Sequence, residues 1–176
     1  MKYVFIFLAI ILSGSAMSQT IIHRDKEIDQ MVKEVNKDTL TKYIDKLVSF
    51  GTRNTFSDTI STKRGIGAAR RWIKSEFEKV SKDCANCLEV FYQKDFVTTN
   101  DGERVPKDTW IVNVVAIQRG TANSNRYIIM TGDIDSRNSD PIDFTNDAPG
   151  ANDNASGMAG TIEAARVLSN YKFEHN

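Results

Sequence analysis

Apolar residues recur along the first part of the chain at steps of three and four, which is the spacing of an amphipathic helix. The pattern predicts one or two helices over residues 26–50, ended by Gly51. A polar loop, residues 52–62, separates them from the clearest helical pattern of the chain, residues 63–81. There, one face is apolar and the other is charged; the apolar positions are Ile66, Ala69, Ile73, Phe77 and Val80.

Three strand-like stretches follow. Residues 88–97 and 110–118 alternate in part, and the turn-forming sequence Asn100-Asp101-Gly102 lies between them, so we expect an antiparallel pair. Residues 126–131 contain a short continuous apolar run, which is typical of a strand buried on both faces of a sheet. A loop over residues 136–152 leads to a last predicted helix, residues 155–169.

This order of elements predicts an α/β fold. We expect a three-layer sandwich in which helices flank a mixed, largely parallel central sheet, incomplete within these residues. Ligands in such folds gather beyond the carboxyl ends of the strands. Asp133 and Asp135 follow the third predicted strand directly, and Asp153 comes just before the last helix.

Composition narrows the class of protein. The chain has 176 residues, of which 40% are hydrophobic and 26% charged, as expected of a single globular domain rather than a disordered segment. Its 23 basic and 23 acidic residues balance. A neutral surface gives no electrostatic attraction to nucleic acid, so we expect no nucleic-acid partner.

The first residues have the layout of a secretory signal peptide. Lys2 precedes an apolar run over residues 4–12, and small residues follow it, with Ala16 and Ser18 at the positions required for cleavage before Gln19. The run is too short to cross a bilayer, and no later segment is apolar enough to do so. We therefore expect a signal peptide over residues 1–18, and a secreted or periplasmic domain over 19–176 with no membrane partner once the signal is removed.

The two cysteines, Cys84 and Cys87, are separated by Ala85 and Asn86. In an exported protein this spacing predicts a small local disulfide. A thioredoxin-type redox pair would follow a strand and open a helix, whereas this pair follows a predicted helix and precedes a strand. A zinc site would need further ligands, and the two histidines, His23 and His175, lie far away in the sequence.

Three carboxylates carry the candidate chemistry. Asp133 and Asp135 belong to the sequence Gly-Asp-Ile-Asp-Ser, and Asp153 belongs to Ala-Pro-Gly-Ala-Asn-Asp-Asn-Ala-Ser-Gly over residues 148–157. Hard oxygen ligands from several backbone segments can hold divalent metal ions. A structural interpretation is also open, because aspartates commonly cap helices, as Asp153 would, or form turns, as Asp133 and Asp135 would.

These residues resemble the M28 family of zinc aminopeptidases. Members of that family typically show Gly-His-x-Asp-Ser at the end of a strand and, further on, Ala-Pro-Gly-Ala-Asp-Asp-Asn-Ala-Ser-Gly opening a helix. Asp135-Ser136 and residues 148–157 match these two motifs closely, and residues 163–168 resemble the helix that follows. The matches at residues 51–54 and 113–116 are looser.

The resemblance implies a peptidase that removes N-terminal residues from peptide substrates with two divalent metal ions, expected to be Zn²⁺. Asp153 would bridge the two ions, which lie about 3.5–4 Å apart in two-metal sites. The peptide bond from Asp153 to Asn154 would be cis, and Asp135 would orient a ligand. Gly150 and Gly157 would allow close backbone approach.

The chain departs from the family at one metal position. Asp133 stands where the family usually has the first histidine ligand. A carboxylate can bind zinc at a similar distance but is a harder and more negative ligand, so the resemblance implies either a metal site with altered metal preference or a degenerate site.

The resemblance also implies that the general base and the remaining ligands lie beyond Asn176. In the family these are an adjacent pair of glutamates, another acidic ligand and a late histidine. No catalytic residue is therefore assigned, and these residues alone are expected to be inactive. Two alternatives remain open: a non-catalytic M28-like binding domain with a degenerate metal site, and an acyltransferase of the glutaminyl cyclase type.

Overall fold

The computed structural model describes residues 24–122, 125–140 and 142–176. The predicted signal peptide, residues 1–18, lies outside them. The chain divides after Gln30 into two compact units, and the hydrophobic core belongs to the second, residues 31–176. Within the described part of the chain, no helix is both long and apolar enough to cross a membrane.

The helical pattern over residues 26–50 forms two helices, α2 (Lys26–Glu34) and α3 (Lys37–Val48). They separate at Asn36, whose Oδ1 accepts a hydrogen bond of 2.9 Å from the N–H of Thr39 and so caps the start of α3. The helices α4 (Gly65–Asp83) and α5 (Ser156–Leu168) begin and end within two residues of their predicted bounds. The hydrophobic spacing alone was therefore sufficient to locate all four.

The sheet is an antiparallel pair, β1 (Leu88–Val97) and β2 (Thr109–Gln118), with Tyr92 opposite Val114. This confirms the predicted hairpin. Near its free end Phe96 and Trp110 face each other across the strands with ring centroids 5.0 Å apart. Such aromatic cross-strand pairs stabilise a two-stranded ribbon where no helix covers it.

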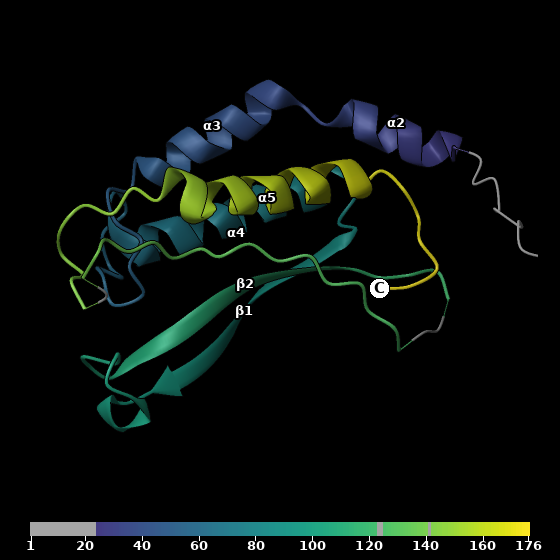
Figure 1. Cartoon of the computed structure of the whole chain (residues 1–176). Helices are drawn as coiled ribbons and strands as arrows, with labels where there is room; N and C mark the ends of the chain where they lie inside the picture. Colours follow the sequence, from purple (N-terminus) through teal and green to yellow (C-terminus); the bar gives the residue numbers. More distant parts are fainter. Residues whose placement is uncertain (1–23, 123–124, 141) are drawn as a thin grey trace, which may run out of the picture. The chain divides into compact units, whose positions relative to one another are not determined.

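The core lies where α3, α4 and α5 meet above one face of the hairpin (Figure 1). Its most buried side chains include Leu47 of α3, Ile73 of α4 and Ile162 of α5, each 0% exposed. Val90 and Val114 of the hairpin pack against this cluster. The α/β class is thereby confirmed, with helices and a sheet sharing one core.

A buried ion pair fastens α5 to the connection between α2 and α3. Glu163 is 1% exposed, and its Oε1 accepts hydrogen bonds of 2.7 Å from both the N–H of Asn36 and the guanidinium of Arg166. Arg166 also donates to the carbonyl of Glu34 at 2.7 Å. Burial raises the pKa of Glu163, but these hydrogen bonds and the Arg166 charge outweigh it and hold that pKa below its usual value. Glu163 thus has a structural role.

The third predicted strand, residues 126–131, is wrong. The segment has no regular secondary structure, and Ile128 and Ile129 are 82% and 80% exposed. Its recorded backbone partner is Asn176, which accepts from the N–H of Ile128 at 2.9 Å and donates to the carbonyl of Arg126 at 3.2 Å. A strand buried on both faces needs neighbouring strands and two covering layers, which the described residues do not supply. The described sheet is accordingly two-stranded, without the expected parallel strands.

The exposed apolar segment predicts self-association of this chain. We expect residues 19–176 to aggregate, because the adjacent exposed isoleucines offer an apolar surface to other copies of the chain. Replacing Ile128 and Ile129 together by Lys should raise the soluble fraction and lower the apparent mass in light scattering. Ile60→Lys is the control, since Ile60 is 87% exposed but stands alone. Equal effects of the two changes would contradict the prediction.

Candidate metal site

The segment that carries Asp133 lies against the start of α5. A Cβ atom added to Gly132 would lie 2.8 Å from the backbone N and Cα atoms of Met158, so only glycine permits this approach. Asp133 follows Gly132 directly, and Asp153 lies in the turn, Ala151–Ala155, that leads into α5. The close contact therefore places the two candidate ligands on adjoining backbone segments.

Asp153 is not the cap of α5. The N–H of Gly157 donates instead to Oδ1 of Asn154 at 2.8 Å, so Asn154 supplies the capping oxygen. The backbone at Asp153 is not helical (φ −113°, ψ 97°), and its peptide bond to Asn154 is cis, in agreement with the resemblance. Asp153 and Asp133 are both exposed, and neither carboxylate has a hydrogen bond or ion pair within the described residues.

Asp135 has a different environment. One of its carboxylate oxygens accepts a hydrogen bond of 3.2 Å from the hydroxyl of Thr55, and its negative charge acts on two buried arginines, Arg53 and Arg70. Burial lowers the pKa of both guanidinium groups, that of Arg53 to about 10, and the charge of Asp135 partly offsets this. Asp135 therefore belongs with the arginines beneath the loop rather than with the two unpartnered carboxylates.

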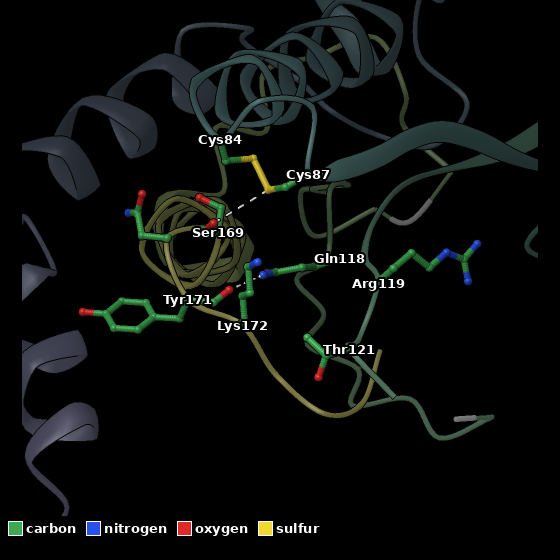
Figure 2. A pocket seen from close by; sticks show the side chains of 9 residues that line it. Cys84, Cys87, Gln118, Arg119, Thr121, Ser169, Tyr171 and Lys172 are labelled. Carbon is green, nitrogen blue, oxygen red and sulfur yellow. Dashed lines mark hydrogen bonds between the residues drawn. A yellow bond between two sulfur atoms is a disulfide. The ribbon is translucent and has the colours of Figure 1, made fainter. Parts of the chain in front are cut away.

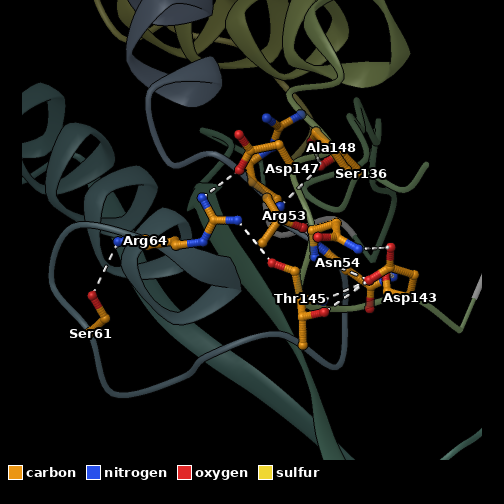
Figure 3. A network of polar contacts seen from close by, with 11 residues as sticks. Arg53, Asn54, Ser61, Arg64, Ser136, Asp143, Thr145, Asp147 and Ala148 are labelled. Carbon is orange, nitrogen blue, oxygen red and sulfur yellow. Dashed lines mark hydrogen bonds and ion pairs between the residues drawn. The ribbon is translucent and has the colours of Figure 1, made fainter.

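Arg53 is the most heavily bonded side chain of the site. It is 1% exposed, and its guanidinium donates to four carbonyl oxygens. The acceptors and distances are Ile134 at 2.9 Å, Leu47 at 3.0 Å, Pro149 at 2.7 Å and Gly150 at 3.0 Å. The planar guanidinium thus holds the end of α3, the segment after Asp133 and the loop before Asp153. Figure 3 shows Arg53 beside Ser136 and Ala148 at this junction.

Ser136 closes the same junction from the other side. Its hydroxyl accepts from the N–H of Arg53 at 3.0 Å and donates to the carbonyl of Ala148 at 2.5 Å, and its own N–H donates to the carbonyl of Arg53 at 3.3 Å. Gly150 packs against Ser136 at this junction. It has φ +48°, and an added Cβ atom would lie 2.6 Å from Cβ of Ser136. Residues 133–136 and 148–150 are consequently both anchored to the segment that follows α3.

The loop between these anchors is organised by Asp143. Its carboxylate accepts from the N–H groups of Asn146 and Thr145, each at 3.1 Å, and from the amide of Asn138 at 2.6 Å. Hydrogen bonds from Asn146, followed by those from Thr145 and Asn138, hold the pKa of Asp143 well below its usual value. Because its oxygens are already used in this turn, Asp143 is not available as a metal ligand.

Comparison with known proteins gives the family. The model of peptidase family M28 matches residues 113–176, which include Asp133, Asp153 and the start of α5. A probable zinc metalloprotease of Leptosphaeria maculans is 43% identical over 145 residues, covering 82% of this chain and 33% of that protein. The chain belongs to peptidase family M28. This confirms the resemblance drawn from the two sequence motifs.

Further relatives of the M28 chain are also described as probable zinc metalloproteases. A probable zinc metalloprotease of Pyrenophora tritici-repentis is 37% identical over 148 residues, or 84% of this chain and 34% of the relative. Another, of Phaeosphaeria nodorum, is 34% identical over 171 residues, or 90% of this chain and 34% of the relative. The chain thus spans about a third of the length of these relatives. No solved structure gives a significant match.

The donor set of this M28 chain suits zinc but is partial. Asp133 and Asp153 offer carboxylate oxygens, which zinc accepts, and neither is engaged by another group among the described residues. Within those residues no three side chains of His, Cys, Asp or Glu are grouped so as to hold a metal ion. Two carboxylates at the loop therefore fit one part of a metal cage that needs further ligands.

A pocket of the M28 chain lies at the disulfide between Cys84 and Cys87, whose Cα atoms are 5.5 Å apart (Figure 2). It has a volume of about 350 Å³ and is bordered by Gln118, whose side chain donates to the carbonyl of Tyr171 at 2.7 Å. No aspartate or glutamate lines it. It is therefore separate from the candidate metal residues and lacks hard oxygen ligands.

Sequence reasoning missed Arg53, the residue that organises the site. Its segment, residues 51–54, was noted as a loose family match, but a lone arginine in a polar loop gives no signal of burial. The useful signal is Gly51, which lies just after the end of α3 and has φ +71°. That conformation turns the chain so that Arg53 points back beneath the loop.

Replacing Arg53 tests its role in holding the loop. In the full-length M28 protein, Arg53→Lys removes the fork that reaches Ile134, Pro149 and Gly150, and we expect a loss of roughly 3 kcal/mol in the free energy of unfolding. Chemical denaturation measures this. The control is Arg64→Lys, because Arg64 pairs with Asp147 at 2.6 Å on the exposed surface. A loss similar to that of Arg64→Lys, which should stay below about 1 kcal/mol, would contradict the role.

Proposed function

We propose that this chain is the N-terminal part of a secreted aminopeptidase that hydrolyses N-terminal peptide bonds with a zinc pair. The observation that carries the proposal is the pair of exposed, unpartnered carboxylates, Asp133 and Asp153, on adjoining segments of an M28 chain. The relatives are described as probable zinc metalloproteases, which supports the metal and the reaction class.

Each acidic residue has a distinct task in this proposal. Asp153 and Asp133 would hold the metal ions, with Asp153 as the ligand common to both, and Asp135, which accepts a hydrogen bond from Thr55, would orient a ligand. Bound there, metal ions would supply Lewis-acid polarisation of the scissile carbonyl and would lower the pKa of the attacking water. Arg53 and Ser136 hold the segments that carry Asp133 and Asp153 at fixed positions relative to each other.

The rest of the catalytic domain follows Asn176 in this proposal. The general base and the remaining ligands would come from that part, because the relatives are about three times as long as the matched region. The whole domain would then have a three-layer sandwich with a largely parallel sheet. Secretion is supported by the signal-like residues 1–18 and by the disulfide, which persists in oxidising compartments.

A second candidate, a binding domain without catalysis, is favoured by one observation. Asp133 occupies the position of a family histidine, and its added negative charge changes the preference of the site toward harder cations. Metal analysis of the full-length protein separates the candidates, because a folded protein that binds no zinc cannot use the proposed mechanism.

Asp153→Asn should abolish peptidase activity. The change keeps the size of the side chain but removes the charge shared by the two ions, so kcat/KM for an aminoacyl substrate should fall on the order of 10³-fold or more. The measurement is hydrolysis by the full-length protein, with bound zinc determined in parallel. Asp147→Asn is the matched control in the same loop and should retain activity, because Asp147 pairs only with exposed Arg64 among the described residues. Near wild-type activity of Asp153→Asn would refute the assignment.

Changing Asp133 tests whether it binds metal. Asp133→Ala should lower the zinc content from two ions per protein toward one, because one ligand of a single ion is lost. Asp133→His should retain both ions and increase the preference for zinc over manganese, since imidazole is a softer donor than carboxylate. Competition dialysis followed by metal analysis measures both effects. Unchanged stoichiometry and affinity in Asp133→Ala would exclude Asp133 as a ligand.

A further inference from the structure

A separate pocket lies beside the candidate metal residues. It has a volume of about 300 Å³, which is at the lower end for small-molecule sites and large enough for one amino-acid side chain. Three segments form it: the residues after Arg53, the β1–β2 hairpin with its connecting loop, and the segment after Asp133. Its lining includes Thr55, Phe56, Arg104, Ile111, Asp135 and Arg137.

Two of the lining residues are arginines that lack acidic partners. Arg104, in the loop of the hairpin, and Arg137 are both exposed, and neither makes an ion pair or side-chain hydrogen bond within the described residues. Exposed arginines elsewhere in the chain do pair, as Arg64 does with Asp147 and Arg119 with Glu89, each at 2.6 Å. The guanidinium groups of the pocket are therefore available to a ligand.

The single acid in the lining does not neutralise them. Asp135 accepts a hydrogen bond from Thr55, and its charge lies close enough to buried Arg53 and Arg70 to act on their pKa values. The negative charge of Asp135 is thus balanced by the buried guanidinium groups of Arg53 and Arg70. With two guanidinium groups against one carboxylate in the lining, the pocket itself remains positive.

The apolar part of the pocket restricts what can enter. Phe56, 9% exposed, and Ile111 of β2 form walls without hydrogen-bonding side chains. Such walls favour contact with methylene groups, while planar guanidinium groups bind a carboxylate through paired hydrogen bonds. The combination suits a short aliphatic chain that ends in a carboxylate.

The pocket is also connected to the candidate metal residues through the backbone. Asp135 and Arg137 lie two and four residues after Asp133 in one continuous segment, whose position Arg53 and Ser136 fix. Two residues of chain span at most about 7 Å, so a peptide whose scissile carbonyl lay at Asp133 would have its neighbouring residue close to the backbone of Asp135 in the pocket lining.

We propose that Arg104 and Arg137 form a subsite for a carboxylate of the peptide substrate, so that the enzyme prefers peptides with an acidic group next to the bond it cleaves. This inference rests on the proposed function for the identity of the substrate as a peptide. The carboxylate can belong to an acidic side chain or to a free C-terminus, and matched substrates distinguish the two sources.

The kinetic test uses the full-length, zinc-loaded protein and three dipeptides: leucyl-glutamate amide, leucyl-glutamine amide and leucyl-glutamine with a free C-terminus. We expect kcat/KM to be about tenfold higher for a peptide with a carboxylate than for leucyl-glutamine amide. If glutamate amide alone is preferred, the subsite reads the side chain, and if free glutamine alone is preferred, it reads the C-terminus. Equal values for all three would overturn the subsite.

Charge-removing variants assign the preference to the two arginines. Arg104→Gln and Arg137→Gln should each lower kcat/KM for the carboxylate substrate and leave kcat/KM for leucyl-glutamine amide unchanged. The ratio of the two values should therefore fall toward one. Lys63→Gln is the control for loss of one positive charge, because Lys63 is exposed and does not line the pocket. A uniform loss for all substrates would overturn the assignment.

A binding measurement separates failure of the subsite from failure of the proposed function. Acetyl-glutamate amide is titrated into the full-length Asp153→Asn protein, with and without Arg137→Gln, and saturation-transfer NMR gives the affinity. Binding that weakens at least about fivefold in the double variant supports the subsite even if no peptidase activity exists. Absence of binding, or binding that Arg137→Gln does not change, overturns the subsite while leaving the peptidase proposal to its own test.

Discussion

The candidate site depends on one buried guanidinium. Among the described residues, no carboxylate is hydrogen-bonded to Arg53; its charge is met by four carbonyl oxygens from three separate parts of the chain. Carbonyl dipoles stabilise a buried cation only when several point at it together, so the arrangement is cooperative. If one segment moves away, the remaining oxygens leave the cation poorly solvated. The loops therefore keep a defined position, because moving any one of them would leave the buried guanidinium of Arg53 without enough acceptors.

Much of the fold could be predicted from side-chain spacing. Helices α3, α4 and α5 and the hairpin could be predicted because each packs one face against the core, and such a face leaves a periodic apolar pattern in the sequence. Helix α2 has the same spacing, although none of its residues is buried. The segment at residues 126–131 could not be predicted in the same way. A continuous apolar run specifies that a strand is covered, but the covering layers and neighbouring strands are not among the described residues. Its composition is correct for a sheet interior, and its environment in this structure is solvent.

The candidate ligands were located from sequence, whereas their support was not. Asp133 and Asp153 stand out because acidic residues follow a predicted strand and precede a helix. What holds them is a set of backbone contacts: Gly132 against Met158, and Ser136 between Arg53 and Ala148. Contacts to backbone carbonyls leave little trace in the sequence, since any residue supplies the acceptor. The choice between a capping and a ligand role for Asp153 likewise required the structure, in which Asn154 provides the cap.

The crossing of Gly132 over the first turn of α5 separates the geometry of the metal loop from the chemistry of its ligands. Because Gly132, Arg53 and Ser136 determine the backbone conformation, the side chain at position 133 can be replaced without changing that conformation. A histidine and an aspartate can then occupy the same place in different members of one lineage. Selection could in this way retune which cation such an enzyme uses by a single codon, while the scaffold around it stays as it is.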